Sequence, residues 1–262
     1  MSIVRLAATV ILVRPPFEVY LTRRSARSAF APDAFVFPGG TVDVADFSAA
    51  AQERTLGLEP ERMAAQFRAS IPSALPSDEP VLEHTARPAL FVAAMRELFE
   101  EAGILPASDA DGVSIDAADL AAADREAVRS GTTSFAGFLS ARGWFADARA
   151  LTLFSHWITP RSEPRRYNTH FFLAAAPPDQ AALADASETH DGVWIAPAAA
   201  LERMREGSMH LVFPTIKHLE RLQGFDRIDT ALTFARTKPI LTIVPRDAGD
   251  DFAIPPALEN AW

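Results

Sequence analysis

The amino-acid sequence predicts an α+β fold. Stretches rich in β-branched and aromatic residues mix with helical stretches along the chain, without the regular strand–helix alternation of a doubly wound parallel sheet. The 262 residues are 48% apolar and 23% charged, a balance typical of a globular protein with a packed core. This length allows one large domain, or one domain with sizeable insertions.

The first predicted strands lie at the beginning of the chain. Residues 7–14 and 18–22 flank a diproline turn, so we expect them to pair as a hairpin. We expect residues 1–14 to form a strand rather than a signal peptide, because they are few, contain an internal arginine and lack a basic leader. Residues 35–40 are expected to form a short strand that ends in a tight turn.

Residues 49–70 are predicted to be mostly helical, with interruptions near Gly57 and Pro60. Prolines at positions 72, 76, 80 and 88 then indicate a surface loop without a periodic core of its own. The clearest helix is predicted over residues 89–102, because Gly103 follows it in the usual place for a C-terminal cap.

The second half of the chain continues the mixed pattern. Asp116 and Ser134 are suited to cap the helices that follow them, and Pro197 and Pro214 stand near the first turns of two more. The predicted helices are 116–129, 134–142, 197–205 and 214–222. The predicted strands are 151–158, 170–174, 192–195 and 239–244. A proline-containing tail is expected after the last strand.

Charge and composition exclude several classes of protein. Lys and Arg number 25 against 34 Asp and Glu, and the resulting net charge of −9 disfavours general binding to nucleic acid or anionic membranes. No apolar run approaches the ~20 residues of a membrane-spanning helix. The chain has no cysteine, which excludes disulfides, thiolate zinc sites and cysteine nucleophiles, and its six histidines show no zinc-ligand spacing.

The segment that carries chemistry is the helix at 89–102. Glu97, Glu100 and Glu101 lie on one face, nearly opposite an apolar face. The apolar face is formed by Phe91, Met95, Leu98, Phe99 and Ala102. The carboxylates are either a solvated face or a site for a divalent cation such as Mg²⁺, which prefers oxygen ligands. The helix alone does not decide between these two interpretations.

The neighbouring residues favour the second interpretation. Phe37-Pro38-Gly39-Gly40 places two glycines where a positive φ or a close backbone approach is cheap. Together with Arg-Glu-Leu-x-Glu-Glu-x-Gly-Ile at 96–104, this segment resembles the Nudix hydrolases, whose box reads Gly-x5-Glu-x7-Arg-Glu-U-x-Glu-Glu-x-Gly-U, where U is a bulky aliphatic residue. Gly40 fills the first position, and every fixed position from Arg96 onward matches.

The first acidic position of the box departs from the pattern. Asp46 stands where the family has glutamate, and it lies 50 residues before Arg96 rather than eight, which leaves an insertion of 42 residues at 47–88. Such an insertion is tolerable because the entropy of loop closure grows only logarithmically with length.

A box divided in this way resembles the branch of the peroxisomal coenzyme A diphosphatases and their bacterial relatives. Residues 157–160 and 164–172 look similar to that branch, and residues 21–25 are partly similar to its coenzyme A-associated segment. The similarity covers roughly residues 4–222. It implies one Nudix-like domain over 1–262, an α/β/α sandwich with a mixed sheet. The insertion at 47–88, a helical segment at 107–150 and a tail at 245–262 would elaborate that domain.

The resemblance implies a metal-dependent hydrolase that cleaves the diphosphate of a nucleoside-diphosphate derivative, with coenzyme A or acyl-CoA favoured. The alternatives are an ADP-ribose, dinucleotide or NDP-sugar diphosphatase, or a non-catalytic nucleotide-sensing module. In the implied site, Glu97, Glu100 and Glu101 hold Mg²⁺ or Mn²⁺ and Arg96 orients them. Gly39 and Gly40 fix the turn and offer backbone groups.

The general base is left open between a carboxylate of the box and Glu188, whose alternative role is that of an ordinary loop residue. Candidate phosphate contacts, each of which could equally be a surface ion pair, are Arg23, Arg24, Arg27, Arg165 and Arg166. The expected partner is a small-molecule diphosphate, with no nucleic acid and no membrane, and a homodimer is left open. Because Asn260-Ala261-Trp262 is not a peroxisomal signal, we expect a cytoplasmic setting.

Overall fold

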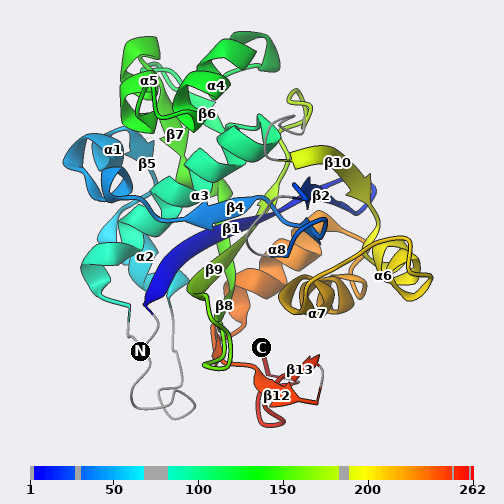
Figure 1. The fold of residues 1–262 in the computed structure, drawn as a ribbon. Helices are drawn as coiled ribbons and strands as arrows, with labels where there is room; N and C mark the ends of the chain where they lie inside the picture. The colour runs from blue at the N-terminus through cyan, green and yellow to red at the C-terminus, as the bar shows by residue number, and fades with distance from the viewer. Residues whose placement is uncertain (1–2, 27–30, 68–81, 183–188, 250, 260) are drawn as a thin grey trace.

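The computed structural model describes residues 3–26, 31–67, 82–182, 189–249, 251–259 and 261–262. A mixed sheet with the strand order β10-β2-β1-β9-β8-β11 lies at its centre (Figure 1). These strands are β1 Val4–Arg14, β2 Glu18–Arg24, β8 Thr152–Ile158, β9 Arg166–Ala175, β10 Thr189–Ile195 and β11 Thr242–Ile243. Two short strands extend it, with β3 (Phe35–Val36) on β2 and β4 (Gly39–Thr41) on β1.

Strand β1 organises the sheet. It pairs in parallel with β9, from Val4 opposite Arg166 to Val13 opposite Ala175. Its end near the predicted hairpin turn is antiparallel to β2. Its earlier residues are antiparallel to β4, where Ala8 lies opposite Gly40. The structure therefore confirms the predicted hairpin and places the segment 39–41 beside the middle of β1.

Two layers of helices bury the two faces of this sheet. Ala8, Val10 and Leu12 of β1 belong to the core under α3 (Arg87–Ala102), whereas Ile11 and Val13 belong to the core on the opposite face. That second core is covered by α6 Pro197–Arg205, α7 Phe213–Leu222 and α8 Ile228–Thr237. This period-two alternation within one buried strand confirms the predicted α/β/α sandwich.

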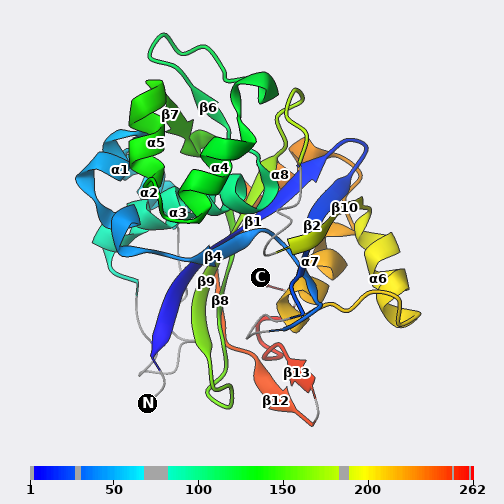
Figure 2. The ribbon, with the colours of Figure 1, turned by 45° about the horizontal axis from the view of Figure 1, so that its top comes forward.

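A lobe made of two separate chain segments packs beyond α3 (Figure 2). The first segment contributes the 3₁₀ turn η1 Val44–Phe47, α1 Ala49–Glu53, β5 Thr55–Leu56 and α2 Pro60–Gln66. The second contributes β6 Ala107–Ser108, η4 Ala117–Asp119, α4 Ala122–Arg129, α5 Phe135–Arg142, β7 Phe145–Asp147 and η5 Ala148–Ala150. A three-stranded sheet, β5-β7-β6, joins the two segments. The segment 107–150, which was predicted to be helical, therefore also contains two strands of this sheet.

Helix α3 has the predicted end and an earlier start. Gly103 follows it in the left-handed conformation (φ 67°), as the cap requires. Pro88, which we assigned to a loop, instead lies in the first turn of the helix, where a missing N–H costs nothing. A further 3₁₀ turn, η3 (His84–Ala86), precedes it, and prolines 72, 76 and 80 lie outside the described residues.

Other predictions needed correction. The helix predicted at 116–129 is broken, because Asp116 caps only the single turn η4 and α4 begins after extended residues at 120 and 121. Helix α8 and the hairpin of β12 (Arg246–Ala248) with β13 (Asp251–Ala253) were not predicted. The tail packs on the molecule, since Trp262 is only 3% exposed within the second core. In the part of the chain that the structure describes, no helix is both long and apolar enough to cross a bilayer.

Candidate functional site

The acidic face of α3 is covered rather than solvated. The side chains of Glu97 and Glu100 are only 12% and 14% exposed, because η1 and α4 pack against the helix on this side. The two segments of the lobe thus enclose carboxylates that the helical pattern by itself would leave in water.

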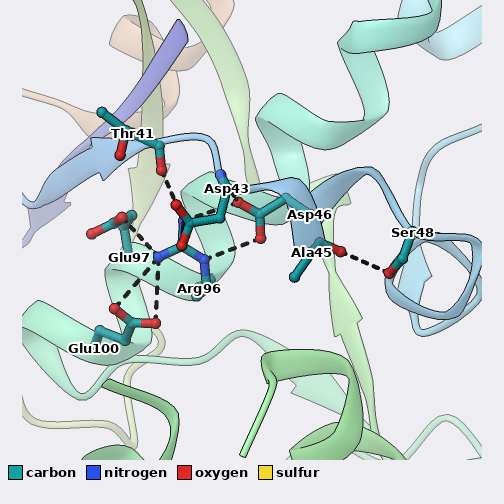
Figure 3. A network of polar contacts seen from close by, with 8 residues as sticks. All are labelled: Thr41, Asp43, Ala45, Asp46, Ser48, Arg96, Glu97 and Glu100. Atoms are coloured by element: carbon teal, nitrogen blue, oxygen red, sulfur yellow. Dashed lines mark hydrogen bonds and ion pairs between the residues drawn. The ribbon is translucent and has the colours of Figure 1, made fainter. Parts of the chain in front are cut away.

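Arg96 and Asp46 form a buried ion pair at the centre of the site (Figure 3). The guanidinium donates from Nε to Asp46 Oδ1 at 3.0 Å and from Nη2 to Asp46 Oδ2 at 2.9 Å. Asp46 is 2% exposed and also accepts the backbone N–H of Asp43 at 2.8 Å. The shorter acidic residue of the divided box therefore reaches the arginine across 50 residues of sequence.

The same guanidinium contacts the catalytic candidates. Arg96 Nη1 donates to Glu97 Oε1 at 2.8 Å and lies 3.4 Å from both oxygens of Glu100, while Nη2 donates to the carbonyl of Thr41 at 2.9 Å. Asp43 lies further away, at 3.8 Å. One arginine therefore faces four carboxylates, among them Glu97 and Glu100 of the predicted metal set.

Burial and mutual repulsion shift the acid–base equilibria of this cluster. Burial raises the pKa of Glu97 to about 7, against the opposing charge of Arg96 and with a further increase from Glu100. Burial also raises the pKa of Glu100. Burial alone would lower the pKa of Arg96, but its hydrogen bond to Asp46 and the surrounding carboxylates raise it above its ordinary value.

The two glycines serve close approach rather than a positive φ. Both lie within β4, not in a tight turn as predicted, and neither has a positive φ. A Cβ on Gly40 would lie 2.4 Å from Oε1 of Glu97, and one on Gly39 would lie 2.5 Å from the carbonyl oxygen of Ala8. The N–H of Gly39 donates to Glu101 Oε2 at 3.0 Å. Strand β4 can therefore lie directly against both β1 and the carboxylates only because it lacks side chains here.

The donor set suits a divalent cation. Glu97, Glu100 and Glu101 offer carboxylate oxygens, the hard ligands that Mg²⁺ and Mn²⁺ prefer, and the buried negative charges are only partly compensated. In this structure the carboxylates contact Arg96 and the N–H of Gly39. Among the described residues, no three Asp, Glu or His side chains already stand in position to hold one ion. The residues fit a metal by their chemistry and burial.

The predicted phosphate contacts Arg23 and Arg24 lie on opposite faces of the sheet. Arg24 lies four residues after Tyr20 on β2, so the two side chains are on the same face of the sheet. Tyr20 belongs to the core under α3, and this is the face of the carboxylates. Arg23 lies on the other face, pairs with Asp33 at 3.2 Å and lines a cavity of about 470 Å³. That cavity is also lined by Arg203 and His210.

The other candidates lie further away or outside the described residues. Arg166 is 7% exposed and donates to the carbonyl of Thr159 at 2.9 Å. Arg166 pairs with Val4 of β1, whereas Thr41, beside the site, pairs with Ala7. Val4 and Ala7 are three residues apart, so Arg166 lies about 10 Å along the strand from the site. Arg165 is exposed next to it. Glu188 and Arg27 lie outside the described residues.

Some neighbours of the site carry no signal that the sequence analysis used. Arg125 of α4 donates from Nε to the carbonyl of Glu100 at 2.8 Å, which ties the lobe to the end of α3. Thr41 takes part through its backbone carbonyl, to which any residue type is equally suited. Residues of this kind become visible only once the segments have been brought together in space.

Comparisons with known proteins agree with this arrangement. The family model described as the NUDT19 Nudix domain matches residues 2–222. The acyl-coenzyme A diphosphatase NUDT19 of Gallus gallus is 30% identical over 255 residues, with 86% of this chain and 66% of that protein covered. Its namesake from Homo sapiens is 30% identical over 240 residues, with 81% and 63% covered. The chain thus spans about two thirds of the length of these relatives.

A solved structure gives the same result for the fold. The NUDIX hydrolase from Alicyclobacillus acidocaldarius superimposes with a TM-score of 0.72 at 28% sequence identity, covering 89% of this chain and 97% of that one. The similarity therefore extends well beyond the acidic helix to most of the sandwich and its lobe.

Proposed function

The chain belongs to the Nudix hydrolase family, through its match to the NUDT19 Nudix domain, and from that premise we propose that it is a metal-dependent diphosphatase acting on coenzyme A or acyl-CoA. The relatives named acyl-coenzyme A diphosphatase support this substrate class. An ADP-ribose, dinucleotide or NDP-sugar diphosphatase is the alternative within the same chemistry.

The observation that carries the proposal is the buried network around Arg96. The network keeps Glu97 and Glu100 together although their like charges repel. It forms even though 42 inserted residues divide the Nudix box. Keeping repelling carboxylates buried costs stability, and that cost is expected where a cation binds. The network therefore supports a catalytic role over a purely structural one.

Nudix hydrolases generally use divalent metal ions, and here Glu97, Glu100 and Glu101 would hold Mg²⁺ or Mn²⁺. Bound there, the ion would neutralise the anionic diphosphate and make a water molecule more acidic. Arg96 holds Glu97 and Glu100 in place, and β4 supplies backbone groups next to Glu101.

The reaction itself is a hydrolysis at phosphorus. The oxygen of water forms a bond to one phosphorus, the bridging P–O bond breaks, and its electron pair stays on the departing phosphate. From coenzyme A the products are 3′,5′-ADP and 4′-phosphopantetheine. A base must accept the water proton, and a carboxylate of the box is one candidate for it. Glu188 remains the predicted alternative.

The substrate's phosphates require cations, because the site is acidic. Arg24 shares the face of the carboxylates, and Arg23 lines a cavity with Arg203. We assign phosphate binding to Arg24 ahead of Arg165 and Arg166, whose place along β9 is further from the carboxylates, and ahead of Arg23, which lies on the opposite face of the sheet. A cytoplasmic setting and a homodimer remain predictions.

A substrate panel tests the proposal. Coenzyme A, acyl-CoA, ADP-ribose, NADH, diadenosine polyphosphates and NDP-sugars would be assayed with Mg²⁺ and with Mn²⁺. We expect the highest kcat/KM on a coenzyme A compound, and a decrease in kcat of about 10²-fold or more for Glu100→Gln, as loss of charge stabilisation predicts. Glu53→Gln, a change of an exposed carboxylate on α1, is the control and should leave kcat unchanged.

The same panel separates an enzyme from a nucleotide-sensing module. A sensor would bind a nucleotide without forming product, and Glu100→Gln would then leave no activity to lose. Absence of turnover with every substrate and both metals would refute the diphosphatase assignment.

A further inference from the structure

A cavity of about 580 Å³ opens beside the carboxylates, between the two segments of the lobe. One wall is the acidic cluster itself, with Asp46, Arg96 and Glu100. The opposite walls come from η1 and α1 of the first lobe segment and from α4 and α5 of the second lobe segment. Figure 3 shows Glu100 on the side of the cluster nearer the green ribbon, which belongs to the second lobe segment. We call this space the lobe cavity.

Mostly small apolar residues and one aromatic ring line the lobe cavity away from the acidic wall. They include Ala45, Ala50, Ala51, Ala136 and Gly137, with the ring of Phe135. The hydroxyls of Thr133 and Ser140 also line it. Walls of methyl groups, one aromatic ring and a few hydroxyls fit a slender, mostly apolar chain that carries occasional amide groups, and the volume lies within the range of small-molecule sites.

The charges of the lobe cavity exclude a phosphomonoester as its occupant. Asp43, Asp46 and Glu100 supply three carboxylates, against Arg96 and Arg129. Both arginines contact carboxylates, since Arg96 binds Asp46 and Arg129 Nη2 lies 2.7 Å from Glu126 Oε2. A second phosphate remote from the cleaved diphosphate would therefore meet more negative than positive charge here.

We propose that the lobe cavity binds the pantetheine arm of the substrate together with a thioester-linked acyl chain. The inference rests on the proposed function, because it takes the diphosphate to lie at the carboxylates. The two halves of coenzyme A on either side of that diphosphate differ in chemistry: the arm is uncharged and amide-containing, while the nucleoside half carries an additional phosphate. Only the arm matches the lining and charge of this cavity.

The proposal also explains what the two added segments do. The insertion at 47–88 and the segment at 107–150 meet at the lobe cavity and enclose it next to Glu100. A Nudix sheet with a bare helix α3 would leave this side open. The segments therefore act as a specificity element for the part of the substrate beyond the diphosphate.

Two pairs of variants test the proposal. Ala50→Phe and Ala136→Leu fill the lobe cavity, while Ala49→Phe and Ala141→Leu place the same side chains on the same helices, at exposed positions outside the lining. Each variant is assayed for kcat and KM on free CoA and on a long-chain acyl-CoA, and for inhibition by the two product halves. Thermal unfolding confirms that each variant is folded.

We expect the two filling variants to raise KM for long-chain acyl-CoA, and the inhibition constant of 4′-phosphopantetheine, by about tenfold or more, as crowding of an apolar subsite predicts. The inhibition constant of 3′,5′-ADP should stay within about twofold of wild type, and the control variants should match wild type throughout.

Three results would overturn the inference, and they are distinguishable. If wild type hydrolyses acyl-CoA and the filling variants behave like their controls, the arm binds elsewhere and the proposed function stands. If the filling variants weaken 3′,5′-ADP instead, the cavity holds the nucleoside half. If wild type hydrolyses only ADP-ribose, dinucleotides or NDP-sugars, the proposed function fails and the inference fails with it.

Discussion

Replacing Asp46 by Asn tests whether the divided box is held together by one buried ion pair. The substitution keeps the size of the side chain but removes the charge that faces Arg96. Asn can still accept the N–H of Asp43 and one guanidinium donor, yet it cannot accept from Nε and Nη2 at once as the carboxylate does at 3.0 Å and 2.9 Å. The change therefore isolates the charge and the paired hydrogen bond.

The expected cost follows from burial. Asp46 is 2% exposed and the Arg96 side chain 9%, so the pair is shielded from water. Breaking a buried ion pair from one side costs about 3–5 kcal/mol. Loss of one of the four negative charges near Arg96 also relieves repulsion, which places the expectation at the lower end, about 3 kcal/mol. At about 2 °C per kcal/mol for a chain of this length, Tm should decrease by about 6 °C.

Thermal and urea unfolding of the metal-free protein, with EDTA present, measures this cost. The matched control is Asp43→Asn, because Asp43 is 64% exposed and lies 3.8 Å from Arg96; it should cost at most about 0.5 kcal/mol. A decrease in Tm below about 2 °C for Asp46→Asn, or equal decreases for the two variants, would refute a stabilising role for the buried pair.

Three further predictions concern the site and the tail. Gly40→Ala places a Cβ 2.4 Å from Glu97 Oε1, so kcat should decrease by about 10²-fold; an unchanged kcat would contradict the close approach. Because the pKa of Glu97 is about 7 when folded and 4.5 ordinarily, the metal-free protein binds more protons when folded and should lose stability, by at most about 3 kcal/mol, as pH rises through this window. Glu97→Gln should reduce this pH dependence in urea unfolding, because Glu100, whose pKa is also raised, still contributes, and an unaltered slope would refute the assignment to Glu97. Trp262→Ala should cost about 3–5 kcal/mol, because the ring is 3% exposed and lies 5.2 Å from Trp157; a cost below about 1 kcal/mol would mean that the tail does not stabilise the core.

Each of these has a matched control. Gly224→Ala adds a Cβ at an ordinary 3.6 Å from its nearest neighbour and should leave kcat unchanged. Glu53→Gln changes an exposed carboxylate and should leave the pH dependence of stability as in wild type. Phe47→Ala removes a ring that is 44% exposed and should cost far less than Trp262→Ala.

Features set by neighbouring residues could be predicted from the sequence. Gly103 ends α3, Ser134 accepts the N–H of Gly137 to cap α5, and Pro197 begins α6, because caps and first turns depend on a few adjacent positions. The spacing of the glutamates on α3 was equally local. These features also underlie the family resemblance, since the Nudix box is largely one helix and the glycines of β4.

The burial of the site could not be predicted in this way. Whether Glu97 faces water depends on β4 and η1, which lie far away in sequence, and the helical period of α3 carries no information about either. The glycines likewise suited a turn or a close approach, and only the pairing of β4 with β1 decides between them.

Other elements were missed for different reasons. Strands β5 and β6 have two residues each, too few to show a period, and they exist because β7 pairs with both. Helix α8 does carry a local signal, since Ile228, Ala231, Leu232 and Ala235 recur at helical spacing just before the predicted strand 239–244. The burial of Trp262 depends on contacts with β8 and α7, which no local pattern specifies.

We propose that Glu97, Glu100 and Glu101 together hold divalent cations beside the substrate diphosphate. Anomalous diffraction from a crystal soaked in manganese tests this metal site. We expect a manganese peak within coordination distance of these carboxylates, with Arg96 still bound to Asp46, and loss of that peak in Glu97→Gln/Glu101→Gln crystals. A structure with no anomalous peak at the acidic face of α3, and with the three side chains bound only to protein donors, would contradict it.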